Sequence, residues 1–502
     1  MTGPRVERLA APPDAADAAA CFADLPYLLL LDSTADRERT GRYSFLAADP
    51  CVVIRSRGMS SQRLGPEEPG WTTIPGDALN AARAALAPHR AEPVPGLPPF
   101  QGGAAGYLGY DWGATLERLP AARYDDLGLP DVMLGLYDWV LAWDHCEQAA
   151  WIISTGMPEV GAQGARRSEE RLAMVRARLA RGPAGAAAHA QPTTATESEV
   201  QPPGAAPSYP VADVEDAQSI GLRSTFTHRA YLTAVSRVRE YILAGDIFQA
   251  NLSQRFQAPL VEPSFRLYRR LRRTNPSAFG AYLQFGDLRI LSASPERFLK
   301  LTGRRVETRP IKGTRPRGLG PMHDEALGRV LAESDKDRAE NVMIVDLLRN
   351  DLSRVCVAGT VQVPELFALE HHPTVHHLVS TVVGQLEPGA DAADLLRATF
   401  PGGSITGAPK VRAMEIIAEL EPTRRGVYCG SLGYLSATGD MDTSIAIRTA
   451  VARHGNVYFQ AGGGIVADSE PEAEYHETLD KARGIIRALA AQHDRPMPPS
   501  QP

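Results

Sequence analysis

Short apolar runs separated by turn residues are the feature that most restricts the fold of this chain. The runs "PYLLLLDS" (26–33), "DPCVVIRS" (49–56), "VMLGLYDWVLAWD" (132–144) and "QAAWIIST" (148–155) have strand length and are rich in β-branched and aromatic residues. Helical patterns come in separate blocks, at 322–352, 391–399, 407–420 and 471–491. Strands and helices in blocks, without strict alternation, predict an α+β fold built on antiparallel sheets.

A change in composition divides the chain. Residues 181–210 are mostly Ala, Pro, Gly, Ser and Thr, and such a segment cannot bury enough apolar surface to offset its ordering entropy. We therefore expect an N-terminal region at 1–180, a flexible Ala/Pro-rich linker at 181–225 and a second region at 226–490. The polar, proline-rich residues 491–502 are expected to form a disordered tail.

Composition and charge exclude several classes of protein. The net charge of −6 over 502 residues gives no reason to expect nucleic acid or an anionic membrane as a partner. No apolar run approaches the roughly 18–20 residues of a membrane span, and the first residues lack the apolar core of a signal peptide. The five cysteines include no CxxC pair. Scattered cysteines in so long a chain fit a reducing compartment, so we expect a cytoplasmic protein.

Two pairs of carboxylates have helical spacing. Asp337 and Glu340 lie three residues apart, as do Glu474 and Glu477, with Lys481 one turn beyond. Two such pairs facing each other could hold a hard cation such as Mg²⁺. Solvated helix faces have the same spacing, so the residues alone leave both interpretations open.

Other residues suggest an anion site. Gly462, Gly463 and Gly464 could bring backbone N–H groups into a concavity suited to a carboxylate, or could form a tight turn or bulge. Arg448, in "SIAIRTA", alternates with apolar residues and could project into a cavity. His377 stands beside an apolar stretch, where a structural histidine is the more common case.

The stretch "RPIKGTRPRG" (309–318) contains one lysine among three arginines. Lys312 is either a solvated cation or a nucleophile whose pKa is lowered by burial and by Arg309, Arg315 and Arg317. The residues alone do not decide between these two interpretations.

Nine strings together resemble the chorismate-utilising enzymes, which include the component I proteins of anthranilate and aminodeoxychorismate synthases and the isochorismate and salicylate synthases. The strings, in chain order and covering essentially all of 226–490, are "GDIFQANLSQRF", "SASPERFL", "RPIKGTRPRG", "DRAENVMIVDLLRNDL", "HHLVSTVVGQL", "FPGGSITGAPK", "GVYCGSLGYLS", "SIAIRTA" and "AGGGIVADSEPEAEYHETLDKA". The segment 29–50 also resembles the start of component I proteins. The resemblance implies large antiparallel β-sheets packed as a sandwich with helices outside, and makes 226–490 the catalytic region.

The resemblance also implies a role for each matching residue. Glu340 and Glu477 would bind Mg²⁺, supported by Asp337 and Glu474, and the metal would hold the ring carboxylate of chorismate. The enolpyruvyl carboxylate would be held by Ser404, Tyr428, Arg448, Lys481 and the backbone of Gly462, Gly463 and Gly464. Glu296 would be the general acid that protonates the departing C4 hydroxyl, and His377 would orient groups near the ring.

Two positions select among the branches of this family. Lys312 is shared with the aminodeoxychorismate synthase branch, where a lysine attacks C2 and ammonia then attacks C4; the anthranilate synthase branch has alanine there. Gln249, beside the substrate, replaces the lysine base of isochorismate and salicylate synthases and cannot accept a proton from water. The resemblance therefore implies amination of chorismate to 4-amino-4-deoxychorismate, for 4-aminobenzoate and folate synthesis.

The chain shows no glutaminase motif, so ammonia is expected from a separate glutamine amidotransferase subunit. The alternatives are an anthranilate synthase component I and a non-catalytic chorismate-binding subunit. A non-catalytic subunit is expected to have lost the acid or the metal-binding residues, yet Glu296, Glu340 and Glu477 are all present. Asp32, Ala278 and Phe279 depart from the tryptophan pocket of feedback-inhibited anthranilate synthases. They argue against tryptophan inhibition and leave open a tryptophan bound as a structural element.

Overall fold

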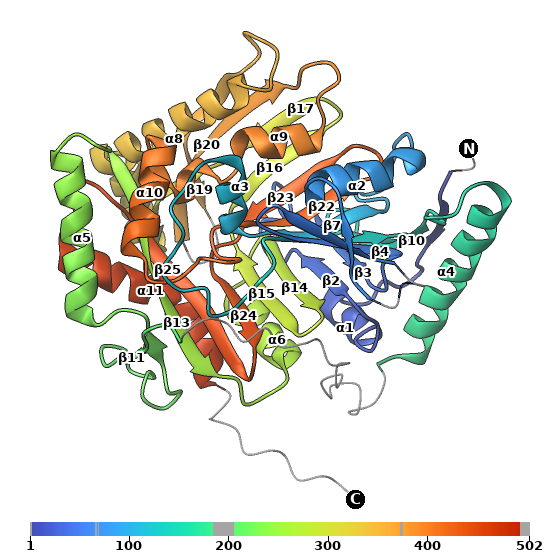
Figure 1. The fold of residues 1–502 in the computed structure, drawn as a ribbon, viewed down its shortest axis with the longest axis horizontal. Helices are drawn as coiled ribbons and strands as arrows, with labels where there is room; N and C mark the ends of the chain where they lie inside the picture. The colour runs from blue at the N-terminus through green and yellow to red at the C-terminus, as the bar shows by residue number, and fades with distance from the viewer. Residues whose placement is uncertain (1–2, 66–67, 69, 184–204, 372–374, 492–502) are drawn as a thin grey trace, which may run out of the picture.

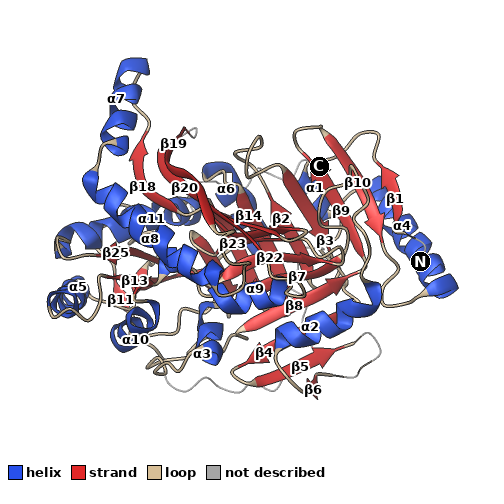
Figure 2. Ribbon diagram, turned by 90° about the horizontal axis from the view of Figure 1, so that it is seen from above, coloured by secondary structure: helices blue, strands red, loops and turns tan. Residues whose placement is uncertain are grey.

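A computed structural model describes residues 3–65, 68, 70–183, 205–371 and 375–491. Two large sheets cross the centre of the molecule, and helices cover their outer faces (Figures 1 and 2). The strand pairings within both sheets are antiparallel. No helix of the described part is long and apolar enough to cross a membrane.

The first sheet has 13 strands. In spatial order they are β1 (Arg5–Arg8), β10 (Ala149–Ser154), β9 (Trp139–Asp144), β3 (Tyr43–Ala47), β2 (Leu28–Asp32), β14 (Phe279–Phe285), β15 (Leu288–Ser294), β24 (Thr449–Arg453), β25 (Asn456–Ile465), β13 (Gln249–Pro259), β12 (Arg223–Ser224) and β11 (Tyr209–Pro210), with β21 (Gly407–Ala408) paired to β13.

The second sheet has 12 strands. In spatial order they are β18 (Ile311–Pro316), β20 (Val375–Gln385), β17 (Arg305–Thr308), β16 (Arg297–Thr302), β23 (Met441–Ile445), β22 (Ser431–Ser436), β7 (Gly103–Leu108), β8 (Val132–Tyr137), β4 (Val52–Arg57), β5 (Ser60–Leu64) and β6 (Thr72–Ile74), with β19 (Gln362–His371) paired to β20.

The helices begin and end where the local sequence directs. Ser334 caps α8 by accepting from the Asp337 amide, which divides the expected helical block 322–352 into two helices. Thr227 caps α5 in the same way, as expected from the sequence. The helices are α1 (Ala15–Ala20), α2 (Ala78–Leu86), η1 (Ala87–His89), η2 (Tyr110–Trp112), α3 (Gly113–Leu116), α4 (Gly161–Arg181), α5 (His228–Leu243), α6 (Ser264–Thr274), α7 (Pro321–Ala332), α8 (Asp335–Ser353), α9 (Ala392–Thr399), η4 (Gly403–Ile405), α10 (Lys410–Leu420) and α11 (Pro471–Ala490).

Three apolar layers hold the sandwich together. Leu29, Phe45 and Leu283 of the first sheet meet Tyr107 and Tyr434 of the second in the layer between the sheets. A second layer joins the first sheet to helices that include α5, α6 and α11, and a third joins the second sheet to helices that include α2, α8 and α9. The expected α+β sandwich with helices outside is confirmed.

Strands from the two regions expected at 1–180 and 226–490 share both sheets. In the first sheet β2 pairs with β14, and in the second β7 pairs with β22. Within the expected linker, residues 205–225 contain β11 and β12 and bury Val211, Ile220 and Leu222 in the core, because this part carries large apolar residues. Residues 184–204 of that linker and 492–502 of the expected tail lie outside the described residues.

Candidate active site

Ser404 joins Lys312 to Glu296. Lys312 is on β18, Ser404 is in η4, and Glu296 lies between β15 and β16. The Ser404 hydroxyl donates to Glu296 Oε1 at 2.7 Å, and Lys312 Nζ donates to the Ser404 carbonyl oxygen at 3.2 Å. The two catalytic residues expected from the sequence therefore meet at one serine.

The environment raises the pKa of Glu296 and lowers that of Lys312, and both shifts favour the neutral form of the group. Burial raises the pKa of Glu296 to about 7, although the Ser404 hydroxyl and Lys312 oppose this shift. Burial lowers the pKa of Lys312, and nearby Lys481 acts in the same direction, against Glu340 and Glu296. A carboxylic acid that is partly protonated near neutral pH suits general acid catalysis.

The three arginines around Lys312 each bind a carboxylate. Arg309 pairs with Glu370 at 2.5 Å and Arg315 with Asp337 at 2.9 Å. Arg317 pairs with Asp324 on α7. Each guanidinium charge is therefore compensated, and the lowered pKa of Lys312 comes from burial and from Lys481.

Carboxylates of α8 and α11 approach each other beside β25. Burial raises the pKa of Glu340 and that of Glu474, and the charge of Glu477 adds to both shifts. The pKa of Glu477 is lowered by Lys481, which lies 2.6 Å from its Oε1, although burial acts in the opposite direction. A hard cation would relieve mutual repulsion of this kind between carboxylate oxygens.

These carboxylates do not form a ready coordination shell. Within the described residues, no group of three or more His, Cys, Asp or Glu side chains is placed to hold a metal ion. Asp337 instead accepts from Arg315, and Glu474 accepts from the Ser469 hydroxyl at 2.7 Å. Metal binding by Glu340, Glu474, Glu477 and Asp337 therefore stays a prediction.

The glycine run lies in an extended strand. Gly462, Gly463 and Gly464 belong to β25 and pair with Ser253, Leu252 and Asn251 of β13. The tight turn or bulge that the sequence left open is therefore wrong, since these residues follow a regular antiparallel ladder. A carboxylate contact of this backbone stays a prediction.

Close packing explains why these positions are glycine. A Cβ atom at Gly464 would lie 1.9 Å from Gln249 Nε2, and one at Gly463 would lie 2.9 Å from Glu474 Oε2. Lys481 Nζ donates to the Gly462 carbonyl oxygen at 3.0 Å, which attaches α11 to the strand. The glycines thus let side chains from two elements approach the backbone.

Two of the remaining expected residues, His377 and Arg448, line the space beside β18. His377 and Arg448 line one cavity of about 80 Å³, and His377 Nδ1 is 2.9 Å from the Thr314 hydroxyl. Burial lowers the pKa of Arg448, for which the described residues supply no ion pair. The buried Tyr428 ring lies 5.7 Å from the Arg425 guanidinium carbon. Arg448 is therefore a cation available to an anionic ligand.

Sequence reasoning missed two buried cations that fix the loop around Ser404. Arg425 donates to the carbonyl oxygens of Ile405 and Asn251, at 3.0 and 2.8 Å, and pairs with Glu421. Lys410 bonds Asp351 at 2.6 Å. Both residues stand in quoted or adjacent strings, but no local pattern indicates which distant backbone atoms they reach.

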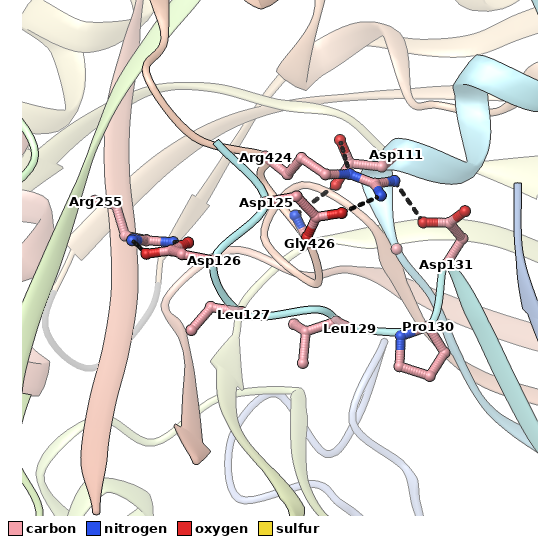
Figure 3. A pocket seen from close by; sticks show the side chains of 11 residues that line it. Asp111, Asp125, Asp126, Leu127, Leu129, Pro130, Asp131, Arg255, Arg424 and Gly426 are labelled. Atoms are coloured by element: carbon pink, nitrogen blue, oxygen red, sulfur yellow. Dashed lines mark hydrogen bonds and ion pairs between the residues drawn. The ribbon is translucent and has the colours of Figure 1, made fainter. Parts of the chain in front are cut away.

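A second charged pocket is closed by its own ion pairs. Arg424 lies 2.9 Å from Asp125, 2.6 Å from Asp131 and 3.4 Å from Asp111 (Figure 3). The cavity beside them measures about 10 Å³. The space is too small for an organic acid, and three carboxylates already bind Arg424, so this pocket is not the candidate active site.

A larger cavity of about 250 Å³ lies between the sheets. Asp32, Ser33, Ala278 and Phe279, from the segments that the sequence analysis associated with a tryptophan pocket, all line it. Asp32 is engaged by Arg272 and by the Tyr268 hydroxyl, the latter at 2.9 Å. Tryptophan binding here stays untested.

Comparisons with known proteins place this chain in a family. The family model of the chorismate binding enzymes matches residues 28–487. The chain is 43% identical over 467 residues to aminodeoxychorismate synthase component 1 of Salmonella typhimurium, covering 93% of both chains. It is 45% identical over 419 residues to anthranilate synthase component 1 of Streptomyces coelicolor, covering 82% of this chain and 78% of that one.

A crystal structure of anthranilate synthase component I from Streptococcus pneumoniae has the same fold. It superposes with a TM-score of 0.74 at 34% identity and covers 89% of this chain and 92% of its own. The two names at similar identity leave the product of this chain open. Together, the matched residues and the shared fold establish that the chain belongs to the family of chorismate binding enzymes.

Proposed function

We propose that this protein is component I of an aminodeoxychorismate synthase, which converts chorismate and ammonia to 4-amino-4-deoxychorismate. One observation carries the proposal. Lys312 and Glu296 are hydrogen-bonded to the carbonyl oxygen and the hydroxyl of Ser404, so an amine and a carboxylic acid are held next to each other without a direct hydrogen bond between them. The Salmonella typhimurium relative with this name supports the same product.

The proposed reaction has two displacements. The Lys312 amine forms a bond to C2 of chorismate, the ring double bonds shift, and the C4–oxygen bond breaks. Glu296 gives its proton to the departing hydroxyl, which leaves as water. Ammonia then bonds to C4, the double bonds return, and the C2–lysine bond breaks. One proton passes from the added nitrogen to the site, so chorismate and ammonia yield aminodeoxychorismate and water.

The anionic groups of chorismate match the cations of the site. Arg448 and Lys481 would bind the enolpyruvyl carboxylate, with Tyr428 and the β25 backbone beside it. His377 would orient groups near the ring. Mg²⁺, when bound to Glu340 and Glu477 with Asp337 and Glu474 nearby, would neutralise the ring carboxylate.

We further propose a glutamine amidotransferase subunit as the source of ammonia, because the chain shows no glutaminase motif and its aminodeoxychorismate synthase relative is named a component 1. The product would enter 4-aminobenzoate and folate synthesis. The five free cysteines fit a cytoplasmic location.

The decisive experiment compares wild type, Lys312→Ala and Lys312→Arg with chorismate, Mg²⁺ and ammonium, with and without an aminodeoxychorismate lyase. We expect lyase-dependent 4-aminobenzoate from the wild type and none above background from either variant. The arginine variant is the matched control, since it keeps the charge but has no nucleophilic amine at neutral pH. Undiminished 4-aminobenzoate from Lys312→Arg would rule out the lysine adduct.

A second candidate function is that of anthranilate synthase component I. The 45% identity to the Streptomyces coelicolor protein favours it. In that case the wild type forms fluorescent anthranilate without any lyase, and Lys312→Ala leaves the yield unchanged. The same assay therefore separates the two functions.

A further inference from the structure

We infer that a β-bulge at Lys312 and Gly313 sets the direction of the Lys312 amine, and that Gly313 is a positioning residue for the reaction. This inference rests on the proposed function, because it requires Lys312 as the nucleophile. It goes beyond that function by assigning the placement of the amine to the backbone geometry of β18 and to the elements packed against it.

The pairing of β18 with β20 contains one extra residue on β18. Ile311 pairs with Val379, and Thr314 pairs with His377. Two residues of β18 therefore lie between these pairs, but only one residue of β20, which is the definition of a β-bulge. The two partners on β20 are two residues apart and share a face of the strand. Ile311 and Thr314 therefore share a face as well, although they are three residues apart.

The bulge changes the direction of the residues that follow it. A regular ladder would place Thr314 opposite His376, on the other face of β20. With the bulge, the Thr314 hydroxyl lies 2.9 Å from His377 Nδ1. Bulges next to active sites often re-aim a side chain. Here one of the two bulged residues is Lys312, whose Nζ donates to the Ser404 carbonyl oxygen at 3.2 Å.

Gly313 is the residue that permits this bulge. Its φ of 81° lies in the left-handed region, which residues with a Cβ atom rarely adopt. Two helices, α7 and α8, pack against β18 and β20 (Figure 2). A Cβ atom at Gly313 would lie 2.8 Å from Leu331 Cδ1 of α7 and 3.0 Å from Asp337 Cβ of α8. Since Leu331 is fully buried, a side chain here would push β18 away from both helices.

Helix α8 also braces β20 next to the bulge. Asn341 and Ser380 are fully buried, and the Ser380 hydroxyl donates to Asn341 Oδ1 at 2.5 Å. Asn341 Nδ2 lies 3.5 Å from the carbonyl oxygen of Leu378, the residue opposite the bulge. The Ser380 amide donates at 3.3 Å to the carbonyl oxygen of Pro310, immediately before β18. A strain placed in the bulge is therefore not relieved by a movement of β20 and is transmitted to Lys312.

The test compares the full wild-type chain with Gly313→Ala, each given chorismate and Mg²⁺ without ammonium. Under the proposed function the lysine nitrogen bonds to C2 and loses one proton to the site, while the C4 hydroxyl takes a proton from Glu296 and leaves as water. The chain then gains the mass of chorismate minus one water. Rapid acid quenching and mass spectrometry of the intact chain measure the rate of this gain, and peptide mapping locates it at Lys312.

We expect the rate of adduct formation in Gly313→Ala to fall about a hundredfold, because a misplacement of about 1 Å has an effect of that size. The chorismate concentration that gives half of the maximal rate should change little, since Arg448 and Lys481 lie on other elements. A purely structural role of Gly313 would not separate these two quantities.

Gly303→Ala is the matched control. Gly303 forms the turn between β16 and β17 with a φ of 57°, and among the described residues no atom beyond its chain neighbours would lie within 4 Å of a Cβ atom there. The substitution adds backbone strain without a new contact. We therefore expect a lower melting temperature and an unchanged rate of adduct formation.

Should Gly313→Ala fail to fold, Ser380→Ala tests the same inference. It removes the hydroxyl that holds Asn341 and adds no strain to the bulge, so we expect the rate of adduct formation to fall about tenfold. Both variants are also measured with MgCl₂ raised until the rate no longer increases, because Asp337, beside Gly313, is one of the residues expected to support the metal.

Three results would overturn the inference. An adduct that forms in Gly313→Ala as fast as in the wild type would show that the bulge does not position the amine. Recovery of the wild-type rate at high MgCl₂ would assign Gly313 to the carboxylates of α8. An equal fall of the rate in Gly303→Ala would make the effect one of general stability. Failure of the proposed function gives a different result, since the wild type itself then gains no mass at Lys312, and the inference falls with it.

Discussion

Lys312 and Lys410 hold the same segment, residues 399–410, with different sets of partners. Lys410 Nζ donates to Asp351 at 2.6 Å and to the carbonyl oxygens of Thr399 and Pro401 at 2.8 and 2.9 Å. Within the described chain, Lys312 Nζ donates to one carbonyl oxygen, that of Ser404. Glu296, the acid of the candidate reaction centre, is bonded to the Ser404 hydroxyl instead.

The comparison shows that burial alone does not make a lysine reactive. Burial lowers the pKa of both lysines. Three acceptors occupy all three N–H groups of Lys410, which fixes it as a charged structural clamp. Lys312 has one such bond and a carboxylic acid separated from it by a serine. The number and charge of the partners therefore distinguish the proposed nucleophile from a clamp.

The largest expected effect is the difference in kcat between variants of the two acids, Glu296 and Asp351. Glu296→Gln removes the proton donor, so kcat should fall on the order of 10²–10⁴-fold, measured with ammonium and lyase. Asp351→Asn should keep most of the wild-type kcat, because Asp351 binds the structural lysine Lys410. Equal losses of kcat in both variants would erase the distinction between the two lysine–acid pairs.

The two lysines should differ next in stability. Lys410→Met leaves the buried Asp351 carboxylate without its partner, which should cost about 3–5 kcal/mol of unfolding free energy in urea titrations. Lys312→Met breaks one hydrogen bond to a carbonyl oxygen and should cost less than about 1.5 kcal/mol. Comparable losses would mean that Lys312 is also a structural clamp.

The smallest expected effect is a change in pH dependence. Since Glu296 has a pKa of about 7 and must be protonated to act, kcat/KM should fall as the pH rises above about 7. Ser404→Ala removes a hydrogen bond that lowers this pKa, so the alkaline limb should move to higher pH, by less than about one unit. The profile of Asp351→Asn serves as the control. An alkaline limb that moves to lower pH in Ser404→Ala would contradict this assignment of the acid.

Local patterns predicted much of the fold. The apolar runs became strands, Thr227 became a helix cap, and the spacing of Asp337 and Glu340 put both on α8. Pairing over long distances had no local signal. Nothing near 28–32 indicates β14 as its neighbour, and three glycines in a row suggest a turn more strongly than the strand that β13 and packed side chains impose.

The candidate site was predictable where the family resemblance named a residue. Lys312 and Glu296 were expected on that ground, and the structure brings them to one serine. Residues that act through distant partners were not predictable from the sequence. Arg315 binds Asp337 across the fold, and the bulge at Gly313 is visible only once β18 and β20 are paired.

The sharing of both sheets by early and late strands has a consequence for synthesis on the ribosome. β2 and β7 are translated long before their partners β14 and β22. Until then their edges present unpaired backbone groups, which are sites for aggregation. The first 180 residues therefore cannot finish folding until β14 and β22 have been translated. A gene divided between β10 and β13 would encode two fragments that must find each other before either becomes stable.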